Sequence, residues 1–467
     1  MPSPRVRLPD PVPGWEALRT ELGVPERFPD EVLQEADAAV PVLPARDAQD
    51  LPFLTIDPTG SVDLDQAMAL SRTADGYLVH YAIADVAAFV RPGGSVDREA
   101  HRRGETLYAP DRRTPLHPPV LSEDRASLLA DQVRPAVLWS LTLDAHGELI
   151  GTEVVRAVVR SRRKLDYQTV QEQIDEGSAT PDLLLLQEIG QLRIAAARRR
   201  NAIDLPTPEQ VVDNEGHLTF RAQLPSERWN AQISLLTGMA AAKLMLKGKV
   251  GLLRTLPTPP DDAVESLRRS AHALGVPWPA GVSYGDLLSD LDPNQPAAAA
   301  LLTVATRLLR GAAYTAFDGV MPTPSLHSAV AAPYAHCTAP LRRLADRYVS
   351  EVCLALCAGV PIPDWAQAAL PALPAEMAEA DHKAHALDRA IVDLAEATVL
   401  AQRVGQTFTG VVVESGPKSG TVQLADPAVR GRLDAASAPL GQQVQVRLVE
   451  ADCATRKVRF ALASSSA

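Results

Sequence analysis

The segment Ile56-Asp57-Pro58-Thr59-Gly60-Ser61-Val62-Asp63-Leu64-Asp65-Gln66 carries the strongest chemical signal of the sequence. Its three carboxylates, Asp57, Asp63 and Asp65, lie at the end of an expected strand and in the loop that follows it. Asp63 and Asp65 are two residues apart, so they face the same side of an extended segment. Converging carboxylates repel one another unless a cation lies between them, and such oxygen ligands prefer magnesium or manganese to zinc. The segment predicts a divalent-metal site; a solvated acidic turn is the alternative.

A second segment, residues 333–348, combines a loop with three arginines. Pro340 favours the first turn of a helix, and Arg342 and Arg343 follow it. A helix N-terminus beside a guanidinium group is well suited to a phosphate, so the segment predicts a phosphate-binding site. The alternative is a surface helix with solvated arginines.

Composition limits the possible functions. The chain has 467 residues, 46% of them hydrophobic, which indicates a globular protein of two to four domains. A net charge of −11 excludes a uniformly basic nucleic-acid coat but allows a local basic groove. Four cysteines without a CxxC pair argue against a zinc site or a disulfide scaffold. The proline-rich residues 1–13 lack a signal core, and no apolar run reaches the ~20 residues of a membrane helix. We therefore expect a cytoplasmic protein without a membrane partner.

Three regions follow one another along the chain. Residues 1–50 contain two short helical patterns, which predict either a helix-turn-helix unit or a packing arm. Residues 51–400 are an α+β region, with an antiparallel sheet first and helices after it. Residues 401–467 contain five short alternating segments, which predict a small barrel of the oligonucleotide-binding (OB) type, before an unstructured tail at residues 464–466.

The expected elements are these. Helices are expected at residues 15–22, 29–38, 181–202, 231–247, 263–274, 296–315, 340–358 and 366–404. Strands of the sheet are expected at residues 53–57, 68–71, 77–90, 137–143 and 153–159, and strands of the barrel at 406–414, 421–424, 431–434, 442–451 and 457–462.

Further candidates for contact with nucleic acid lie elsewhere. Residues 160–164 and 198–200 are basic and could follow a phosphate backbone in a nucleic-acid enzyme, although such patches are usually solvated faces. Aromatic residues make up only 4% of the chain, so Tyr108 and Tyr167 are notable. Either ring could stack on a base or pack in the core.

Taken together, these segments resemble the ribonuclease II and ribonuclease R exoribonucleases, the RNB family. Residues 406–462 are similar to the S1 type of RNA-binding barrel that ends these proteins. The other matching segments are Asp57 with Asp63-x-Asp65, residues 81–86, residues 103–112, Leu121-Ser122, Ser127-Leu128, His327 and residues 334–343.

The resemblance implies a catalytic domain, with a mixed sheet and helices around a narrow channel, that takes single-stranded RNA 3′ end first. Hydrolysis with Mg²⁺, or Mn²⁺, then releases nucleoside 5′-monophosphates processively, in RNA decay or processing. A channel enzyme of this kind needs no obligate protein partner, so a monomer is expected. By motif position, Asp57, Asp63, Asp65 and Arg342 are catalytic, and Gln66 joins the aspartates at the metal. RNA contacts are implied for Tyr108, which would stack on the 3′-terminal base, and for Tyr167, Arg342, Arg343, His336 and Asp388.

The sequence departs from the family pattern at several positions. Gln66 replaces a fourth acidic residue, and Leu205 replaces a phenylalanine that would clamp the terminal base. A family glutamate is missing near Gln232 and Ile233, and another is matched only by the shorter Asp388. About fifty helical residues stand where cold-shock barrels are usual. These departures keep two alternatives open: a catalytically silent RNA-binding protein, and a metal phosphodiesterase that acts on DNA or a small nucleotide.

Overall fold

The computed structural model describes residues 14–206, 209–212, 218–293 and 295–463. The proline-rich start and the tail at residues 464–466 lie outside the described residues. No helix in the described part of the chain is long and apolar enough to cross a membrane.

The β-rich region folds into a closed five-stranded barrel. Its strands, in barrel order, are β1 (Phe53–Asp57), β2 (Gln66–Arg72), β3 (Gly76–Ala84), β6 (Val133–Asp144) and β7 (Leu149–Asp166). The expected antiparallel sheet is wrong in one respect, because β1 and β7 pair in parallel and close the barrel. The extra length of β7 explains the closure. Its first half pairs with β6, and its basic second half, excluded from the expected strand, pairs with β1.

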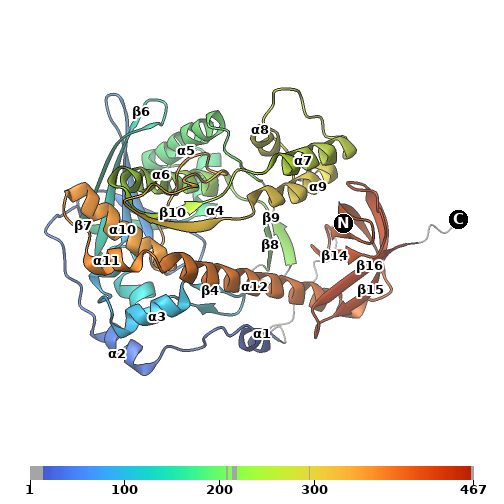
Figure 1. The fold of residues 1–467 in the computed structure, drawn as a ribbon, viewed down its shortest axis with the longest axis horizontal. Coiled ribbons are helices and arrows are strands. Elements are labelled where there is room, and N and C mark those ends of the chain that lie inside the picture. The colour runs from blue at the N-terminus through green and yellow to red at the C-terminus, as the bar shows by residue number, and fades with distance from the viewer. Residues whose placement is uncertain (1–13, 207–208, 213–217, 294, 464–467) are drawn as a thin grey trace.

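Helices cover the barrel and extend from it (Figure 1). Three further pairs of short strands accompany them: β4 (Leu107–Tyr108) with β5 (Arg113–Thr114), β8 (Glu209–Val212) with β9 (Leu218–Arg221), and β10 (Val250–Thr255) with β11 (Ala313–Asp318). The helices are α1 (Trp15–Glu21), α2 (Asp30–Ala38), α3 (Ser95–Arg103), α4 (Tyr167–Asp175), α5 (Pro181–Arg199), α6 (Pro225–Gly248), α7 (Asp261–Ala273), α8 (Tyr284–Ser289), α9 (Pro296–Ala305), α10 (Leu344–Ala358), α11 (Asp364–Ala369) and α12 (Leu373–Leu400).

Three expected helices differ from those observed. The helix expected at residues 296–315 ends at Ala305, because Gly311 turns the chain into β11. The helix expected at residues 366–404 is divided into α11 and α12 at Pro371, which cannot continue a helix. The helix expected from Pro340 begins only at Leu344, and this difference bears on the site described below.

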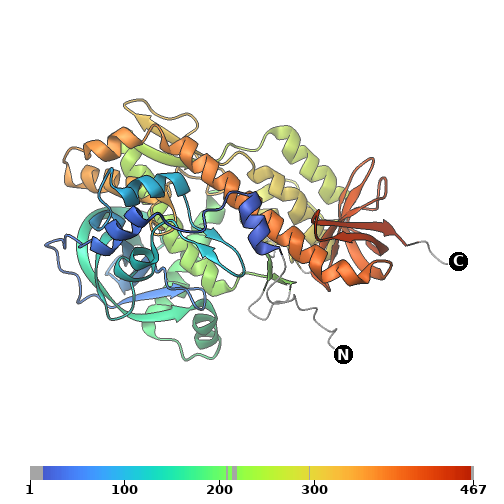
Figure 2. The same cartoon turned by 90° about the horizontal axis from the view of Figure 1, so that it is seen from below.

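The C-terminal region forms the expected barrel. All five predicted strands are present, as β12 (Thr407–Ser415), β13 (Gly420–Leu424), β14 (Arg430–Leu433), β15 (Gln443–Asp452) and β16 (Lys457–Leu462), and they close in the order β12-β13-β14-β16-β15. The 28-residue helix α12, about 42 Å long, runs from the α+β region to this barrel (Figures 1 and 2).

The N-terminal helices belong to different cores. Trp15 and Leu18 of α1 belong to the buried cluster that also holds residues of α12 and of the C-terminal barrel. Figure 2 shows α1 beside α12. Val32 and Ala36 of α2 pack with the core near the first barrel. This separation favours the packing arm over the helix-turn-helix unit.

Candidate active site

The acidic loop is held by a turn and by one buried serine. After β1 ends at Asp57, the amide of Ser61 donates to the carbonyl of Pro58 at 3.1 Å, and Gly60 adopts φ +84°, a conformation strained for other residues. Ser127 then clamps the loop: its hydroxyl donates to the carbonyl of residue 62 at 2.7 Å and accepts from the amide of Leu64 at 2.9 Å. The positions of the following aspartates therefore depend on Ser127.

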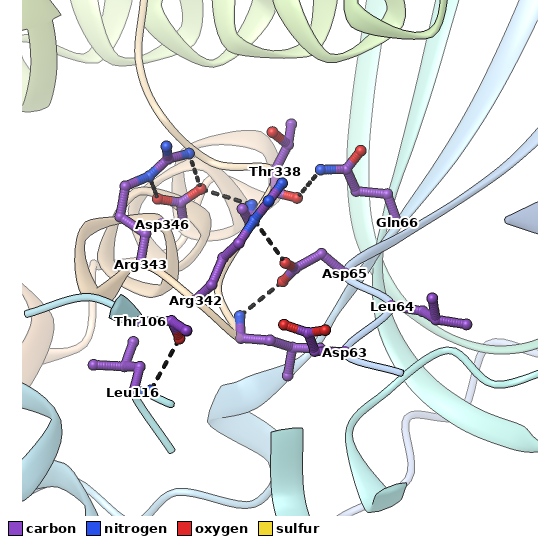
Figure 3. Close-up of polar contacts among 12 residues, drawn as sticks. Asp63, Leu64, Asp65, Gln66, Thr106, Leu116, Thr338, Arg342, Arg343 and Asp346 are labelled. Carbon is purple, nitrogen blue, oxygen red and sulfur yellow. Dashed lines mark hydrogen bonds and ion pairs between the residues drawn. The ribbon is translucent and has the colours of Figure 1, made fainter. Parts of the chain in front are cut away.

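Asp65 connects the acidic loop to the basic segment (Figure 3). Its side chain is only 3% exposed; Oδ1 accepts from the amide of Leu341 at 2.7 Å, and Oδ2 lies 3.3 Å from Nε of Arg342. Burial raises the pKa of Asp65 to about 8, although Arg342 and the Leu341 amide favour the ionised form. The fold thus brings together two segments that lie 276 positions apart.

Asp63 lies within electrostatic reach of both Asp65 and Asp57, and Arg342 also acts on both. Burial raises the pKa of Asp57 to about 6; Arg342 opposes this rise and Asp63 adds to it. Asp63 is engaged by two neighbours, since Arg113 forms an ion pair with it and the Tyr108 hydroxyl donates to it at 3.3 Å. The carboxylates therefore share one partly buried region with Arg342.

Gln66, the departure from the family pattern, has both ends of its amide occupied. Nε2 donates to the carbonyl of Thr338 at 2.7 Å, and Oε1 accepts from the buried Tyr81 hydroxyl. Thr338 in turn shares a 2.7 Å hydrogen bond with Ser234 of α6. The oxygen of Gln66 keeps a second lone pair, so its assignment as a metal ligand stays a prediction.

Where a helix was expected to begin, the basic segment forms a turn at residues 340–342, followed by the extended residue Arg343. The amide of Thr106 donates to the carbonyl of Arg342, and the amide of Leu344 donates to Gly104, each at 2.9 Å. These hydrogen bonds hold Arg343 in an extended conformation, so the helix begins only at Leu344. The helix start predicted at Pro340 is therefore wrong. Phosphate binding by this segment stays a prediction, and the side chain of Arg342 is 48% exposed.

Arg343 and His336, both predicted RNA contacts, are occupied by protein partners. Arg343 forms an ion pair with Asp346 through two bonds, of 2.5 and 2.8 Å, on the side away from Asp63 (Figure 3). His336 lies 2.6 Å from the hydroxyl of Tyr314, and burial holds the pKa of His336 well below its usual range. Only local side-chain chemistry was available to the sequence analysis, and neither partner is adjacent in sequence to the residue it binds.

The remaining predicted contacts are the two tyrosines and Asp388. Tyr108 extends from β4, is 46% exposed, and directs its hydroxyl to Asp63. Tyr167 begins α4 and accepts a 3.0 Å hydrogen bond from Asn230; burial, and next the charge of Asp57, raise the pKa of Tyr167 to about 12. Asp388 is exposed on α12.

Several residues of this region were missed or assigned differently by the sequence analysis. Ser234 of α6, which the sequence analysis did not name, shares a hydrogen bond with Thr338. Leu205 packs with the apolar cluster formed by α7 to α9. The motif Ser127-Leu128 was the one available signal for the clamp on the acidic loop.

The donor set fits a magnesium ion held partly by substrate and water. Among the described residues, no three His, Cys, Asp or Glu side chains lie close enough together to hold a metal ion as a ready-made cage. Magnesium does not need such a cage, because it is commonly bound through one or two carboxylates plus water and substrate phosphate oxygens. Burial, and to a lesser extent the charge of Asp63, raises the pKa of Asp57 and of Asp65, and a cation would stabilise the ionised form of both carboxylates.

Comparison with known proteins agrees with this architecture. Residues 45–358 match the RNB domain, and residues 406–463 match the RNase II-type exonuclease C-terminal S1 domain. Exosome complex exonuclease RRP44 homolog A of Arabidopsis thaliana is 30% identical over 66% of this chain and 35% of its own length. Ribonuclease R of Escherichia coli is 26% identical over 96% of this chain and 62% of its own length. The chain thus spans about a third to less than two-thirds of these curated relatives.

Solved structures share the fold. RNase R of Mycoplasma genitalium, in complex with ribose-methylated single-stranded RNA, superposes with a TM-score of 0.86 at 20% identity, covering 97% of this chain and 78% of that one. Yeast Ssd1, described as a pseudonuclease, gives a TM-score of 0.71 at 17% identity over 93% of this chain and 58% of that one. With two-thirds of its length matching the RNB domain and an S1 domain at its C-terminal end, this chain belongs to the RNB family.

Proposed function

We propose that this chain is a processive 3′→5′ exoribonuclease that hydrolyses single-stranded RNA to nucleoside 5′-monophosphates with magnesium, or manganese, in RNA decay or processing. The observation that carries the proposal is the contact between buried Asp65 and half-exposed Arg342, with Asp57 and Asp63 in electrostatic reach. Negative oxygen donors beside an accessible guanidinium form the arrangement that phosphoryl transfer requires.

In the proposed mechanism, the acidic loop binds the metal and Arg342 binds the phosphate. Asp57, Asp63, Asp65 and Gln66 are the candidate protein ligands, of which one or two at a time, with water and substrate phosphate oxygens, would hold magnesium; when bound, it supplies charge neutralisation and activates water. Arg342 binds the scissile phosphate and offsets the charge that develops on its oxygens. The Leu341 amide fixes the orientation of Asp65, so the carboxylate is already positioned before RNA arrives.

The proposal includes RNA contacts by two tyrosines. Tyr108 would stack on the 3′-terminal base, and its hydrogen bond to Asp63 supports this role; Tyr167, which Asn230 hydrogen-bonds, would contact the preceding nucleotides. Arg343, His336 and Asp388 stay predicted contacts; the first two would have to exchange protein partners for RNA. We also propose that the protein is cytoplasmic and acts as a monomer. Light scattering on the purified chain tests the monomeric state.

A 5′-labelled single-stranded RNA of about thirty nucleotides, incubated with magnesium or chelator, tests the proposed activity. We expect the label to move directly to one short oligomer, only with metal, because a processive enzyme releases no intermediates. A ladder of intermediate lengths would contradict processivity, and cleavage of matched DNA at the same rate would favour the DNA phosphodiesterase alternative.

A silent RNA-binding protein is the second candidate. The observation in its favour is Gln66, whose neutral amide stands where the family pattern has a carboxylate and is already hydrogen-bonded at both ends. The same RNA assay separates the candidates, because RNA that is retained on the protein but stays intact supports the silent form.

The Tyr108 ring is expected to set the length of the final product. In Tyr108→Ala, we expect a longer end product with nearly the same rate on long RNA, because one stacked base contributes ~1–3 kcal/mol. The product is sized on a sequencing gel. Tyr108→Phe, which keeps the ring and loses the 3.3 Å bond to Asp63, is the control and should keep the wild-type end product. An unchanged end product in Tyr108→Ala would refute the stacking role.

Gln66→Asp distinguishes a role of the Gln66 side chain as a metal ligand from its role as a hydrogen-bond donor to Thr338. A carboxylate adds charge beside Asp65, so the magnesium concentration for half-maximal activity should fall severalfold. The maximal rate should also fall, because aspartate cannot donate to Thr338. Both values come from magnesium titrations of the initial rate, and an unchanged half-maximal concentration would rule out the ligand role.

Magnesium should stabilise the protein more at pH 8 than at pH 6. Burial raises the pKa of Asp57 to about 6 and of Asp65 to about 8, from a usual value near 4. Without metal, the folded state binds more protons than the unfolded state from the usual pKa near 4 up to the raised pKa of about 8. The free energy of unfolding therefore falls as pH rises through this range. A cation competes with those protons. Thermal melts with magnesium and with chelator measure the difference, and an equal gain at both pH values would contradict it.

A further inference from the structure

A cavity lies between α5 and α6, which pack side by side (Figure 1). It has a volume of about 270 Å³. The loop at residues 202–204 and the loop at 329–330 close one end, joined by a 2.8 Å hydrogen bond from the amide of Ile203 to the carbonyl of Ala329. Its apolar wall consists of Ile194, Ala197, Ile203, Leu235, Met239 and Val330.

The cavity is separate from the candidate active site. Asn230 and Ser234 of α6 contact Tyr167 and Thr338 of that site. The cavity is lined by a different set of α6 residues, including Leu235 and Met239, which project from another face of the same helix. Helix α6 therefore stands between the two.

Two arginines in the cavity have unused donors. Arg193 is 2% exposed; Nη1 donates to the carbonyl of Gly147 at 2.7 Å, but Nε has no hydrogen-bond partner among the described residues. For Arg200, both Nε and Nη1 are buried without such a partner, and Nη2 has only a 3.9 Å contact with Met239. Buried donors normally have partners, so these groups indicate a missing acceptor.

The surrounding charges do not supply that acceptor. Arg198 pairs with Asp290 at 3.0 Å, Arg199 pairs with Glu148 at 2.9 Å, and Arg228 pairs with Asp204 at the rim. Glu148 also lies 3.5 Å from Arg193, which leaves Arg200 without an ion pair in the described part of the chain. Burial lowers the pKa of Arg200, and lowers that of Arg193 to about 10, with the Arg200 charge adding to the second effect. An anion would relieve this repulsion.

We propose that this cavity binds one nucleotide, with its phosphate on Arg200 and Arg193 and its base against Ile203, Leu235 and Met239. The cavity volume, about 270 Å³, lies just below the usual range of about 300–1,000 Å³ for ligand pockets, so the cavity has room for one nucleotide at most and not for an oligonucleotide. The ligand is either a free mononucleotide or the end unit of an RNA strand. The mononucleotide product of the proposed reaction would be one source, and that attribution alone rests on the proposed function.

Equilibrium dialysis of labelled AMP tests the site on the full chain carrying Asp65→Asn, in chelator, so that neither hydrolysis nor metal contributes. We expect Arg200→Gln to weaken AMP binding about tenfold or more, because it removes charge-assisted hydrogen bonds. The AMP affinity of Arg200→Lys should lie between those of the parent chain and Arg200→Gln, since lysine keeps the charge and lacks the planar donors. Arg199→Gln, on the same helix but outside the cavity lining, is the matched control and should bind AMP normally. Thermal melts establish that each variant is folded.

The outcomes are distinct. Equal affinity for AMP and adenosine, no detectable AMP binding, or unchanged affinity in Arg200→Gln would overturn the proposal. So would loss of AMP binding in Arg342→Gln but not in Arg200→Gln, because the nucleotide would then occupy the active site. If Arg200→Gln also weakens the binding of a short RNA that AMP displaces, the ligand is the end unit of an RNA strand. If the substitution weakens only AMP binding, the ligand is the free mononucleotide. AMP binding by a chain that cannot degrade RNA would keep the cavity assignment and remove only the reaction as its source.

Discussion

Replacing Asp65 with asparagine is expected to reduce RNA hydrolysis by roughly 10³-fold while RNA binding is kept. Asparagine has nearly the same shape, and its side-chain oxygen can still accept from the Leu341 amide at the 2.7 Å position. What it lacks is the negative charge that faces Arg342 at 3.3 Å and that a cation requires. Single-turnover rates on labelled RNA, with affinity measured separately by filter binding, give the two quantities.

Asp75→Asn is the matched control for this substitution. Asp75 is an exposed aspartate in the turn between β2 and β3, so the same change of charge should leave the rate unaffected. Hydrolysis at the wild-type rate in Asp65→Asn would remove Asp65 from the catalytic site. Loss of RNA binding together with hydrolysis would point to a folding defect in the acidic loop.

Replacing Arg342 with glutamine should mainly reduce activity, whereas replacing Arg343 with glutamine should mainly reduce stability. Arg342→Gln should lower the hydrolysis rate by on the order of 10³-fold, the effect expected for a guanidinium that neutralises a transferring phosphate. It should leave the melting temperature nearly unchanged, because Arg342 is 48% exposed and its one carboxylate contact is long. Rates and thermal melts of the two variants, measured side by side, test the distinction.

Arg343→Gln should mainly reduce stability. Its guanidinium neutralises the fully buried Asp346, and removing one partner of a buried ion pair costs about 3–5 kcal/mol. Asp346 also accepts from the amide of Ala339 at 2.7 Å, so the whole loop that presents Arg342 depends on it. If the two variants lose activity and stability to the same extent, the assignment of separate roles is wrong.

Local patterns in the sequence determined much of the fold. The five strands of the C-terminal barrel were each predicted within a few residues, because side-chain alternation and turn formers are properties of neighbouring positions. Helices α5 to α7 follow from their own apolar spacing in the same way. The clustering of Asp57, Asp63 and Asp65 was also visible from spacing alone, since the three lie on one short loop.

Contacts between distant segments decided the rest. The barrel closes because the second half of β7 pairs with β1, about a hundred residues earlier, and no local pattern specifies that partner. Leu344 starts a helix late because Gly104 and Thr106 pair with the loop before it. Arg342 and Arg343 are chemically identical in the sequence. Only the tertiary structure directs one to Asp65 and buries the other against Asp346, because burial and charge pairing depend on which residues the fold places around each side chain.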